Sequence, residues 1–344
     1  MASLVRFLEF DDSCFRKAPH QKHPAMNVTE MSWPILRDIL ENEDWGWLRS
    51  TDDVTSALAE FFCRLLLTVK SSGLAGLLGE VLPKILGGGK EILNPSVFEF
   101  LGCISEILGD TSAIDLPAAL RTVFTAAFMN DGLAMKADPE IIKGLLDMSH
   151  RLLLFTPSLL LAPRQDAGLL DSLLSICTSV VQEHELLALT SACSLVSLLT
   201  FPPRNSPTDT AVSSSRDLIC AVVSKYGERM LRGVLLGLVH DASQGRTVRA
   251  MSGLLFGVLI FMPRVATEEW LYRAIQSDEF RKANTNIQED DFIRAIQIGV
   301  QVLISSMPDV VKRRKFDALI KDLSEVCGGK ADPDVLIAHQ LPST

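Results

Sequence analysis

Aromatic residues are scarce in this chain. Phenylalanine, tryptophan and tyrosine make up 6% of its 344 residues, although hydrophobic residues as a whole make up 47%. Strands draw heavily on aromatic and β-branched side chains, so this composition favours packed helices over a β-sandwich. Basic residues are outnumbered by acidic ones, and the net charge of −9 argues against direct binding of nucleic acid. It suits a protein whose partners carry basic surface.

The spacings that mark metal and catalytic sites are missing from the sequence. Its seven cysteines are scattered without a Cys-x-x-Cys pair, no two histidines stand at i, i+4 around a glutamate, and no Gly-x-Ser-x-Gly occurs. Gly87-Gly88-Gly89-Lys90 is followed by Glu91 rather than Ser or Thr, so it predicts a turn between helices and not a phosphate loop. We therefore expect no enzyme, no cofactor, no metal and no disulfide framework.

Long hydrophobic runs are missing as well. The longest, such as Gly253–Met262, fall short of the roughly 18 residues that a membrane-spanning helix needs. Met1–Phe10 is short and runs directly into Asp11-Asp12, which is not typical of a signal peptide. These features predict a soluble intracellular protein that does not bind a membrane.

What the sequence does contain is a repeating helical unit. Asn94-Pro95 and Asp138-Pro139 stand 44 residues apart, and each pairs a helix-capping side chain with a proline in the first helical position. Thr51-Asp52 and Glu183 mark further helix starts at a similar spacing. Two helices per 40–47 residues is the period of HEAT and armadillo arrays. The predicted fold class is therefore all-α, a superhelical solenoid of HEAT/armadillo-like helical hairpins.

Breaker residues divide the predicted array into segments. Asn27 is expected to cap the first complete helix, with Glu30 completing a capping box, and Thr267 to cap a helix late in the chain. Met1–Phe10 resembles the end of a helix whose partner is missing, which suggests a truncated receptor or gene product. The predicted segments are 1–26, a partial helix and loop; 27–201, HEAT-like hairpins; 202–215, a Pro/Ser-rich loop; 216–328, C-terminal HEAT-like hairpins; and 329–344, a flexible tail.

Several short motifs resemble those of a known family. His23-Pro24 precedes Ser32-Trp33-Pro34-Ile35-Leu36, Glu269-Trp270-Leu271 follows late in the chain, and the final helix carries Arg313-Arg314-Lys315-Phe316. Together with the hairpin period, these motifs resemble the C-terminal part of an importin-β (karyopherin-β) nuclear transport receptor, of the SR-protein transportin and importin-thirteen branch. The resemblance covers nearly all of this chain but only about the last third of such a receptor.

The resemblance implies a cargo-binding module for nuclear protein import. The implied partners are protein cargo and nucleoporins, and the implied location is the cytoplasm and nucleus. The GTPase Ran would bind only if the N-terminal repeats of such receptors, which this chain lacks, were present. The SR-protein transportins bind phosphorylated Arg-Ser cargo through an arginine-rich helix, and the helix in the matching place here is Glu183–Leu199. That helix has no Arg or Lys, so such cargo would find no guanidinium partner there. A cytosolic HEAT scaffold unrelated to transport is the alternative.

Two sets of charged residues are candidate protein-binding sites. Glu140, Lys143, Asp147 and Arg151 recur with His150 at helical spacing on the second helix of a predicted hairpin, the helix that commonly lines the concave face of a solenoid. Lys312, Arg313, Arg314 and Lys315 form the densest basic cluster, which suits an acidic partner or a nuclear localisation element. For both sets a simple solvated helix face is the competing interpretation. His150 and His184 are likewise expected at the surface.

Overall fold

The computed structural model describes nine segments of the chain: residues 24–41, 52–69, 74–86, 92–109, 114–129, 138–161, 167–240, 245–284 and 286–340. Every regular element within these segments is a helix, which confirms the predicted all-α class. The chain forms two compact units, Met1–Leu159 and Leu160–Thr344, and each is described by itself. The stub predicted at Met1–Phe10 and the turn at Gly87–Lys90 lie outside the described residues.

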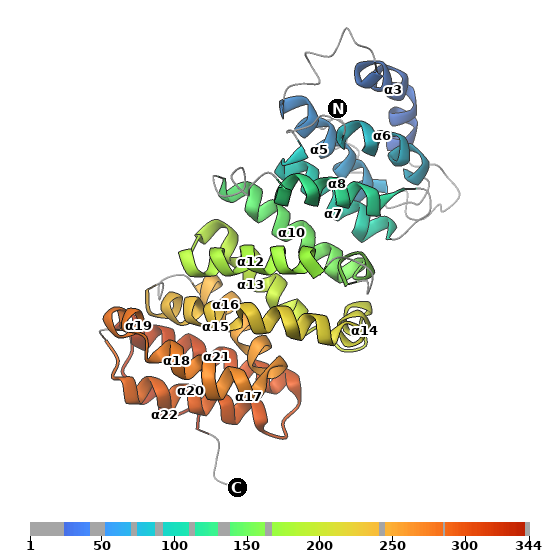
Figure 1. The fold of residues 1–344 in the computed structure, drawn as a ribbon. Coiled ribbons are helices and arrows are strands. Elements are labelled where there is room, and N and C mark those ends of the chain that lie inside the picture. Colours follow the sequence, from blue (N-terminus) through green and yellow to red (C-terminus); the bar gives the residue numbers. More distant parts are fainter. Residues whose placement is uncertain are drawn as a thin grey trace. The chain divides into compact units, whose positions relative to one another are not determined.

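The described part of the first unit consists of helices that pack on one another. Its helices are α3 (Pro24–Glu41), α5 (Asp52–Val69), α6 (Ala75–Leu86), α7 (Pro95–Leu108), α8 (Leu116–Met129) and α10 (Pro139–Phe155). Alternate helices along the chain lie side by side: α7 packs between α5 and α10, and α6 packs against α8 (Figure 1). Each layer of the unit therefore takes every second helix, which is how stacked hairpins bury their apolar faces.

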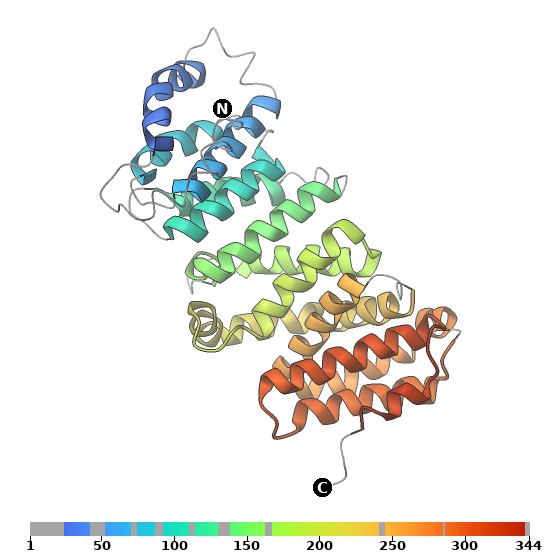
Figure 2. The same cartoon turned by 180° about the vertical axis from the view of Figure 1, so that it is seen from behind.

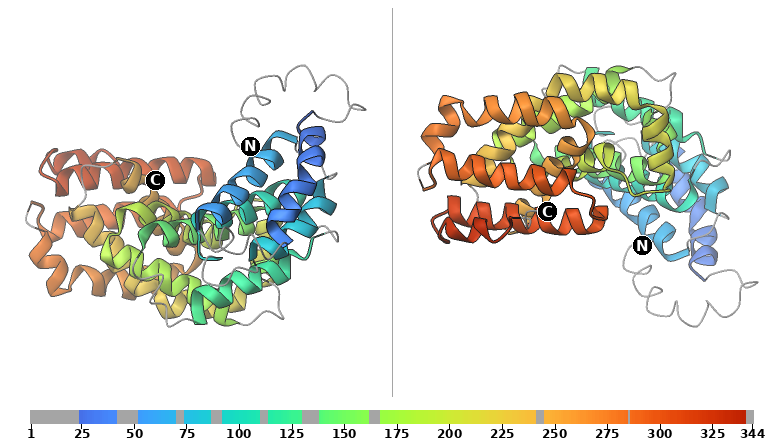
Figure 3. Two further views of the ribbon diagram at one scale, coloured as in Figure 1. Left: turned by 90° about the horizontal axis from the view of Figure 1, so that it is seen from above. Right: turned by 90° about the horizontal axis from the view of Figure 1, so that it is seen from below.

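The second unit continues the same alternation. Its helices are α12 (Ala167–Glu183), α13 (Leu186–Thr200), α14 (Pro207–Ser214), α15 (Arg216–His240), α16 (Gly245–Phe261), α17 (Pro263–Val265), the π-helix η4 (Ala266–Trp270), α18 (Leu271–Ile275), α19 (Asp278–Ala283), α20 (Glu289–Ile304), α21 (Asp309–Cys327) and α22 (Asp334–Ile337). The short α11 (Ser158–Leu161) stands where the two units divide. Helix α12 packs beside α15, and α13 beside α16, which in turn packs against α21 (Figure 2). The same layers are seen from above and below in Figure 3.

The predicted capping residues explain where two helices begin. Asn94 accepts a hydrogen bond from the backbone N–H of Ser96 at 2.9 Å, and Asp138 accepts one from Glu140 at 2.8 Å. Both residues have extended backbone, and a proline follows each one. The starts predicted for α7 at Pro95 and for α10 at Pro139 are confirmed.

Replacing either cap residue tests this account of the helix starts. Asn94→Ala and Asp138→Ala should each lower the free energy of unfolding by about 1 kcal/mol, because each leaves one N–H of the first turn without its acceptor. Urea unfolding followed by circular dichroism measures the change. Asn27→Ala is the matched control and should change stability by less than about 0.5 kcal/mol, because Asn27 lies inside α3 and caps nothing. Equal losses at Asn27 and Asn94 would contradict the account.

Four predictions about helix boundaries were wrong. The first helix begins at Pro24 rather than after Asn27, because proline suits a first turn. The segment 202–215 is not all loop, since Ser206 caps α14 by accepting from the N–H of Asp209 at 3.0 Å. Thr267 does not cap a helix: its hydroxyl donates to the Pro263 carbonyl inside a continuous helical turn.

The fourth correction concerns the helix predicted to start at Glu183. Helix α12 runs through Glu183, and α13 begins at Leu186 behind the cap residue Glu185. The chain turns between them at His184, which has a φ of 52°. The predicted tail at 329–344 also holds structure, because α22 lies within it and His339 contacts Asp322 at 2.7 Å.

Within the described ranges, no single helix is long and apolar enough to span a membrane. One pair of helices, Arg246–Phe261 with Pro263–Ile275, reaches that length and composition only when its two members are taken together, and it is bent by 117° at its break.

Candidate protein-binding surfaces

The polar stripe predicted on α10 is present at three of its four positions. Glu140 and Lys143 are exposed. Asp147 accepts a hydrogen bond from the Lys143 ammonium at 2.9 Å, one helical turn away, and both side chains are nearly half exposed. An exposed pair of this kind adds little stability. These three residues therefore lie at the surface of the first unit, where a partner could reach them.

Arg151, the fourth residue of the stripe, points back toward α7. Its Nη1 lies 3.2 Å from the sulfur of Cys103 and 3.9 Å from a carboxylate oxygen of Glu106. The stem of the side chain runs over Gly102, where an added Cβ would come within 2.8 Å of the arginine Cδ. The charge of Arg151 is thus largely directed at its own unit rather than at a partner.

The two histidines expected at the surface are both partly buried. Burial lowers the pKa of His150, with Asp147 opposing this effect and Arg151 adding to it. His184 lies 2.8 Å from the Gly233 carbonyl through its Nε2, which ties the α12–α13 turn to α15. Surface positions were therefore wrong for both, because each imidazole is partly covered by its surroundings, and that of His184 contacts α15.

The basic cluster on α21 is divided by the packing of that helix. Lys312 donates to the Leu303 carbonyl at 2.9 Å and so satisfies the end of α20. Arg313 turns inward, where it donates to Asp317 at 3.0 Å and lies 5.0 Å from the ring centre of Phe256. Arg314 and Lys315 alone in the cluster are exposed. Half of the predicted cluster therefore has an internal structural role.

A groove of about 700 Å³ lies in the second unit. It is lined by residues of α14, α16, α17, η4, α20 and α21 and by the segment between α13 and α14. We call it the α16–α20 groove. Its lining consists of Phe201, Pro202, Arg204, Asp209, Leu259, Ile260, Pro263, Arg264, Thr267, Glu268, Val300, Leu303, Ile304, Asp309 and Lys312.

Four of the six charged residues that line the α16–α20 groove form ion pairs with one another. Arg204 forms an ion pair with Asp309, and Arg264 lies 3.5 Å from Glu268. The apolar lining of the groove is not fully covered by the protein, because Ile304 at the end of α20 is 76% exposed. A volume in this range, an apolar lining and polar groups at its rim are typical of a binding site. Sequence reasoning missed this groove because its lining comes from six separate helical elements and the segment between α13 and α14.

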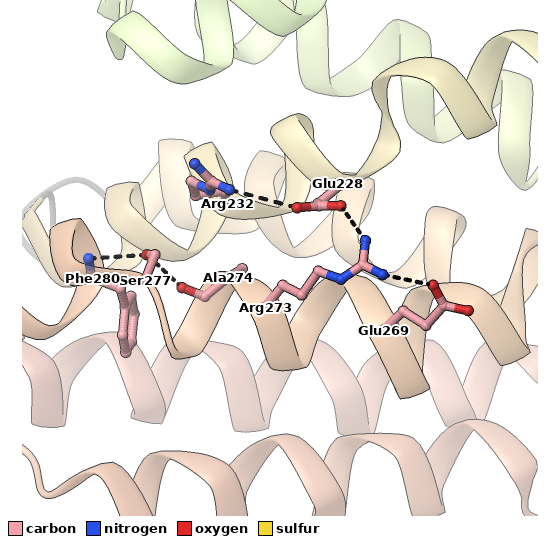
Figure 4. Close-up of polar contacts among 7 residues, drawn as sticks. All are labelled: Glu228, Arg232, Glu269, Arg273, Ala274, Ser277 and Phe280. Atoms are coloured by element: carbon pink, nitrogen blue, oxygen red, sulfur yellow. Dashed lines mark hydrogen bonds and ion pairs between the residues drawn. The ribbon is translucent and has the colours of Figure 1, made fainter.

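A second polar network joins α15 to the helices that follow α17 (Figure 4). Glu228 accepts from Arg273 at 3.0 Å and lies 3.5 Å from Arg232, while Arg273 also donates to Glu269 at 3.1 Å. Beside this network Trp270 packs on Gly227, where an added Cβ would lie 2.2 Å from the indole Cζ3. The Glu269-Trp270-Leu271 motif therefore fixes η4 and α18 against α15.

Chemistry at a metal centre is not suggested by the described residues, since they contain no group of three His, Cys, Asp or Glu side chains able to hold an ion. The six described cysteines are all free.

Comparison of the sequence with models of known protein families gives no match, and comparison with curated proteins gives none either. The candidate sites therefore rest on the geometry described above.

Proposed function

We propose that this chain is a HEAT-like helical-repeat module that binds a protein cargo in the manner of an importin-β receptor. The observation that carries the proposal is a set of contacts between helices that are not neighbours in the chain, and these contacts recur at offsets of 40 to 54 residues. Ser56 contacts Ser96 across 40 residues, and Arg151 contacts Cys103 across 48. In the second unit, Lys225 reaches Asp171 across 54 residues. Stacked repeats of one supersecondary unit produce this pattern.

Binding, rather than chemistry, is the activity that the surfaces support. Four charged groups of the α16–α20 groove form two ion pairs, Arg204 with Asp309 and Arg264 with Glu268, and Ile304 is exposed at the edge of its apolar lining. Such a surface gains free energy by covering apolar area rather than by activating a nucleophile. We propose that a segment of cargo protein lies in this groove, and that Glu140, Lys143 and Asp147 on the first unit offer a separate polar contact.

The partners proposed for the module follow from its resemblance to transport receptors. They are nuclear protein cargo and nucleoporins, in the cytoplasm and the nucleus, with Ran binding reserved for a longer protein that carries N-terminal repeats. The overall excess of acidic residues suits cargo with a basic surface. The exposed Arg314 and Lys315 are too few to reverse that preference.

Affinity capture with matched variants tests the proposal. The full chain, immobilised and incubated with cell extract, should retain nuclear proteins and nucleoporins identified by mass spectrometry. Ile304→Asp should reduce their recovery about tenfold, because it places a carboxylate at the edge of the α16–α20 groove. Ile337→Asp is the control: Ile337 is 46% exposed on α22, outside the groove, and its substitution should leave recovery unchanged.

The second candidate function is a cytosolic helical scaffold that assembles partners unrelated to transport. It is favoured by the all-helical architecture alone. The same capture separates the two candidates. A stable set of partners without nuclear proteins, nucleoporins or Ran would support the scaffold and contradict the transport proposal.

A further inference from the structure

Two cysteines from different hairpins meet inside the first unit. Cys63 on α5 and Cys103 on α7 place their sulfur atoms 2.8 Å apart, closer than two sulfurs in ordinary van der Waals contact. Their side chains are buried, at 4% and 0% exposure. The covalent distance between the sulfurs of a disulfide is about 2.05 Å, so a bond would require the two atoms to approach by less than about 1 Å.

A cation lies next to this pair. The guanidinium of Arg151, on α10, is 3.2 Å from the Cys103 sulfur, and the side chain remains about one-third exposed. Because Gly102 has no side chain, the arginine stem can lie directly over α7 beside Cys103. Arg151 thus places a positive charge beside the Cys103 thiol, and the same side chain reaches solvent.

The surroundings act differently on the two thiols. The hydrogen bond with Cys63 and the charge of Arg151 lower the pKa of Cys103, although burial opposes them. The same hydrogen bond and burial raise the pKa of Cys63. A thiolate flanked by a cation and a second thiol is the arrangement of an oxidisable cysteine with its resolving partner.

Another pair of buried cysteines in the same chain offers a contrast. Burial raises the pKa of Cys177 on α12 to about 12, and burial also raises the pKa of Cys193 on α13. Neither of these shifts has a contribution from a cation. Buried thiols in apolar surroundings are inert, so Cys177 and Cys193 serve as an internal reference for Cys103.

We propose that Cys103 is a site of oxidation by hydrogen peroxide, and that Cys63 converts the oxidised residue into a disulfide that links α5 to α7. In the first step the Cys103 thiolate attacks one peroxide oxygen, the O–O bond breaks, and the departing hydroxide takes a proton to become water. Cys103 is then a sulfenic acid. In the second step the Cys63 sulfur loses its proton and attacks the Cys103 sulfur, and the S–O bond breaks with release of a second water. Two thiols and one peroxide give one disulfide and two waters.

Hydrogen peroxide suits this site because of its small size. The Cys103 sulfur is buried, and the Arg151 guanidinium beside it belongs to a side chain that is about one-third exposed. The product would connect two successive hairpins covalently. Oxidation would thereby restrict any change in their relative position during binding of a partner.

Peptide mapping after controlled oxidation tests the proposal. The reduced full chain is treated with hydrogen peroxide, unfolded, alkylated with a maleimide and digested. The expected first product is a disulfide-linked peptide containing Cys63 and Cys103, while Cys177 and Cys193 remain alkylated. In Cys63→Ser the link should be absent, and a dione that reacts with sulfenic acids should label Cys103.

Variants of Arg151 separate reactivity from folding. Arg151→Gln should slow formation of the link about tenfold, because it removes the charge that helps to lower the pKa of Cys103 and so reduces the fraction of thiolate. Arg151→Lys keeps the charge and should restore most of the rate. Circular dichroism melting of each variant shows whether the first unit is folded. Oxidation of all four cysteines at one rate, or an Arg151→Gln rate equal to that of the unmodified chain, would overturn the proposal.

Discussion

Replacing Gly227 by alanine should destabilise the second unit by about 3 kcal/mol. A Cβ at this position would lie 2.2 Å from the Cζ3 of Trp270 and 2.6 Å from its Cη2, far inside any tolerated contact. Trp270 is 5% exposed and belongs to η4, which packs on α15, so the indole cannot move away without separating the two elements. Overpacking of a buried contact typically costs 1–3 kcal/mol.

Gly168→Ala is the matched control for that substitution. Gly168 is also helical, in α12, but an added Cβ there would meet nothing within 4 Å. Alanine has the higher helix propensity, so this variant should be as stable as the unmodified chain or more stable by up to about 1 kcal/mol. Urea unfolding of the two variants in parallel gives the comparison. Equal stability of Gly227→Ala and the unmodified chain would mean that Trp270 does not pack on α15 as described.

The second large effect is expected at Phe256. Its ring is fully buried in α16 and lies 5.0 Å from the ring of Phe201 and 5.5 Å from that of Phe316, both in edge-on geometry. The guanidinium of Arg313 covers it at 5.0 Å. Phe256→Ala should therefore lower the free energy of unfolding by about 4 kcal/mol, because it removes apolar contacts among three helical segments and leaves a cavity.

Tyr272 provides the control for Phe256. It belongs to the same unit, on α18, but its side chain is 56% exposed. Tyr272→Ala should change stability by less than about 0.5 kcal/mol. Thermal unfolding should show a broad, early transition for Phe256→Ala alone. Similar transitions for the two variants would contradict the assignment of Phe256 to the centre of the α16–α21 packing.

Local signals in the sequence were sufficient to predict most helices. The starts of α7 and α10 were predictable because Asn94-Pro95 and Asp138-Pro139 determine them by local hydrogen bonds. A polar cap residue before a proline also stands at Ser206-Pro207, where it marks the start of α14. The serine- and proline-rich composition of that segment suggested a loop, although the cap predicts the helix correctly.

The candidate sites depended on contacts that no local signal reveals. Arg151 shares its helix face with Lys143 and Asp147, but the absence of a side chain at Gly102 on another helix allows it to turn toward Cys103. Arg313 also turns inward, because its guanidinium donates a hydrogen bond to Asp317 and lies over the ring of Phe256. One signal was available: Cys63 and Cys103 stand 40 residues apart, which is one repeat, so equivalent positions on neighbouring hairpins were predictable as neighbours.

Nuclear uptake of a large carrier is the measurement that tests the proposed function most directly. The full chain is fused to an inert carrier too large to diffuse through nuclear pores and is added with cytosol to permeabilised cells. The account predicts accumulation of the fusion in nuclei, and blockade by a lectin that binds nucleoporins. Exclusion of the fusion from nuclei that admit the same carrier on an established importin would contradict it.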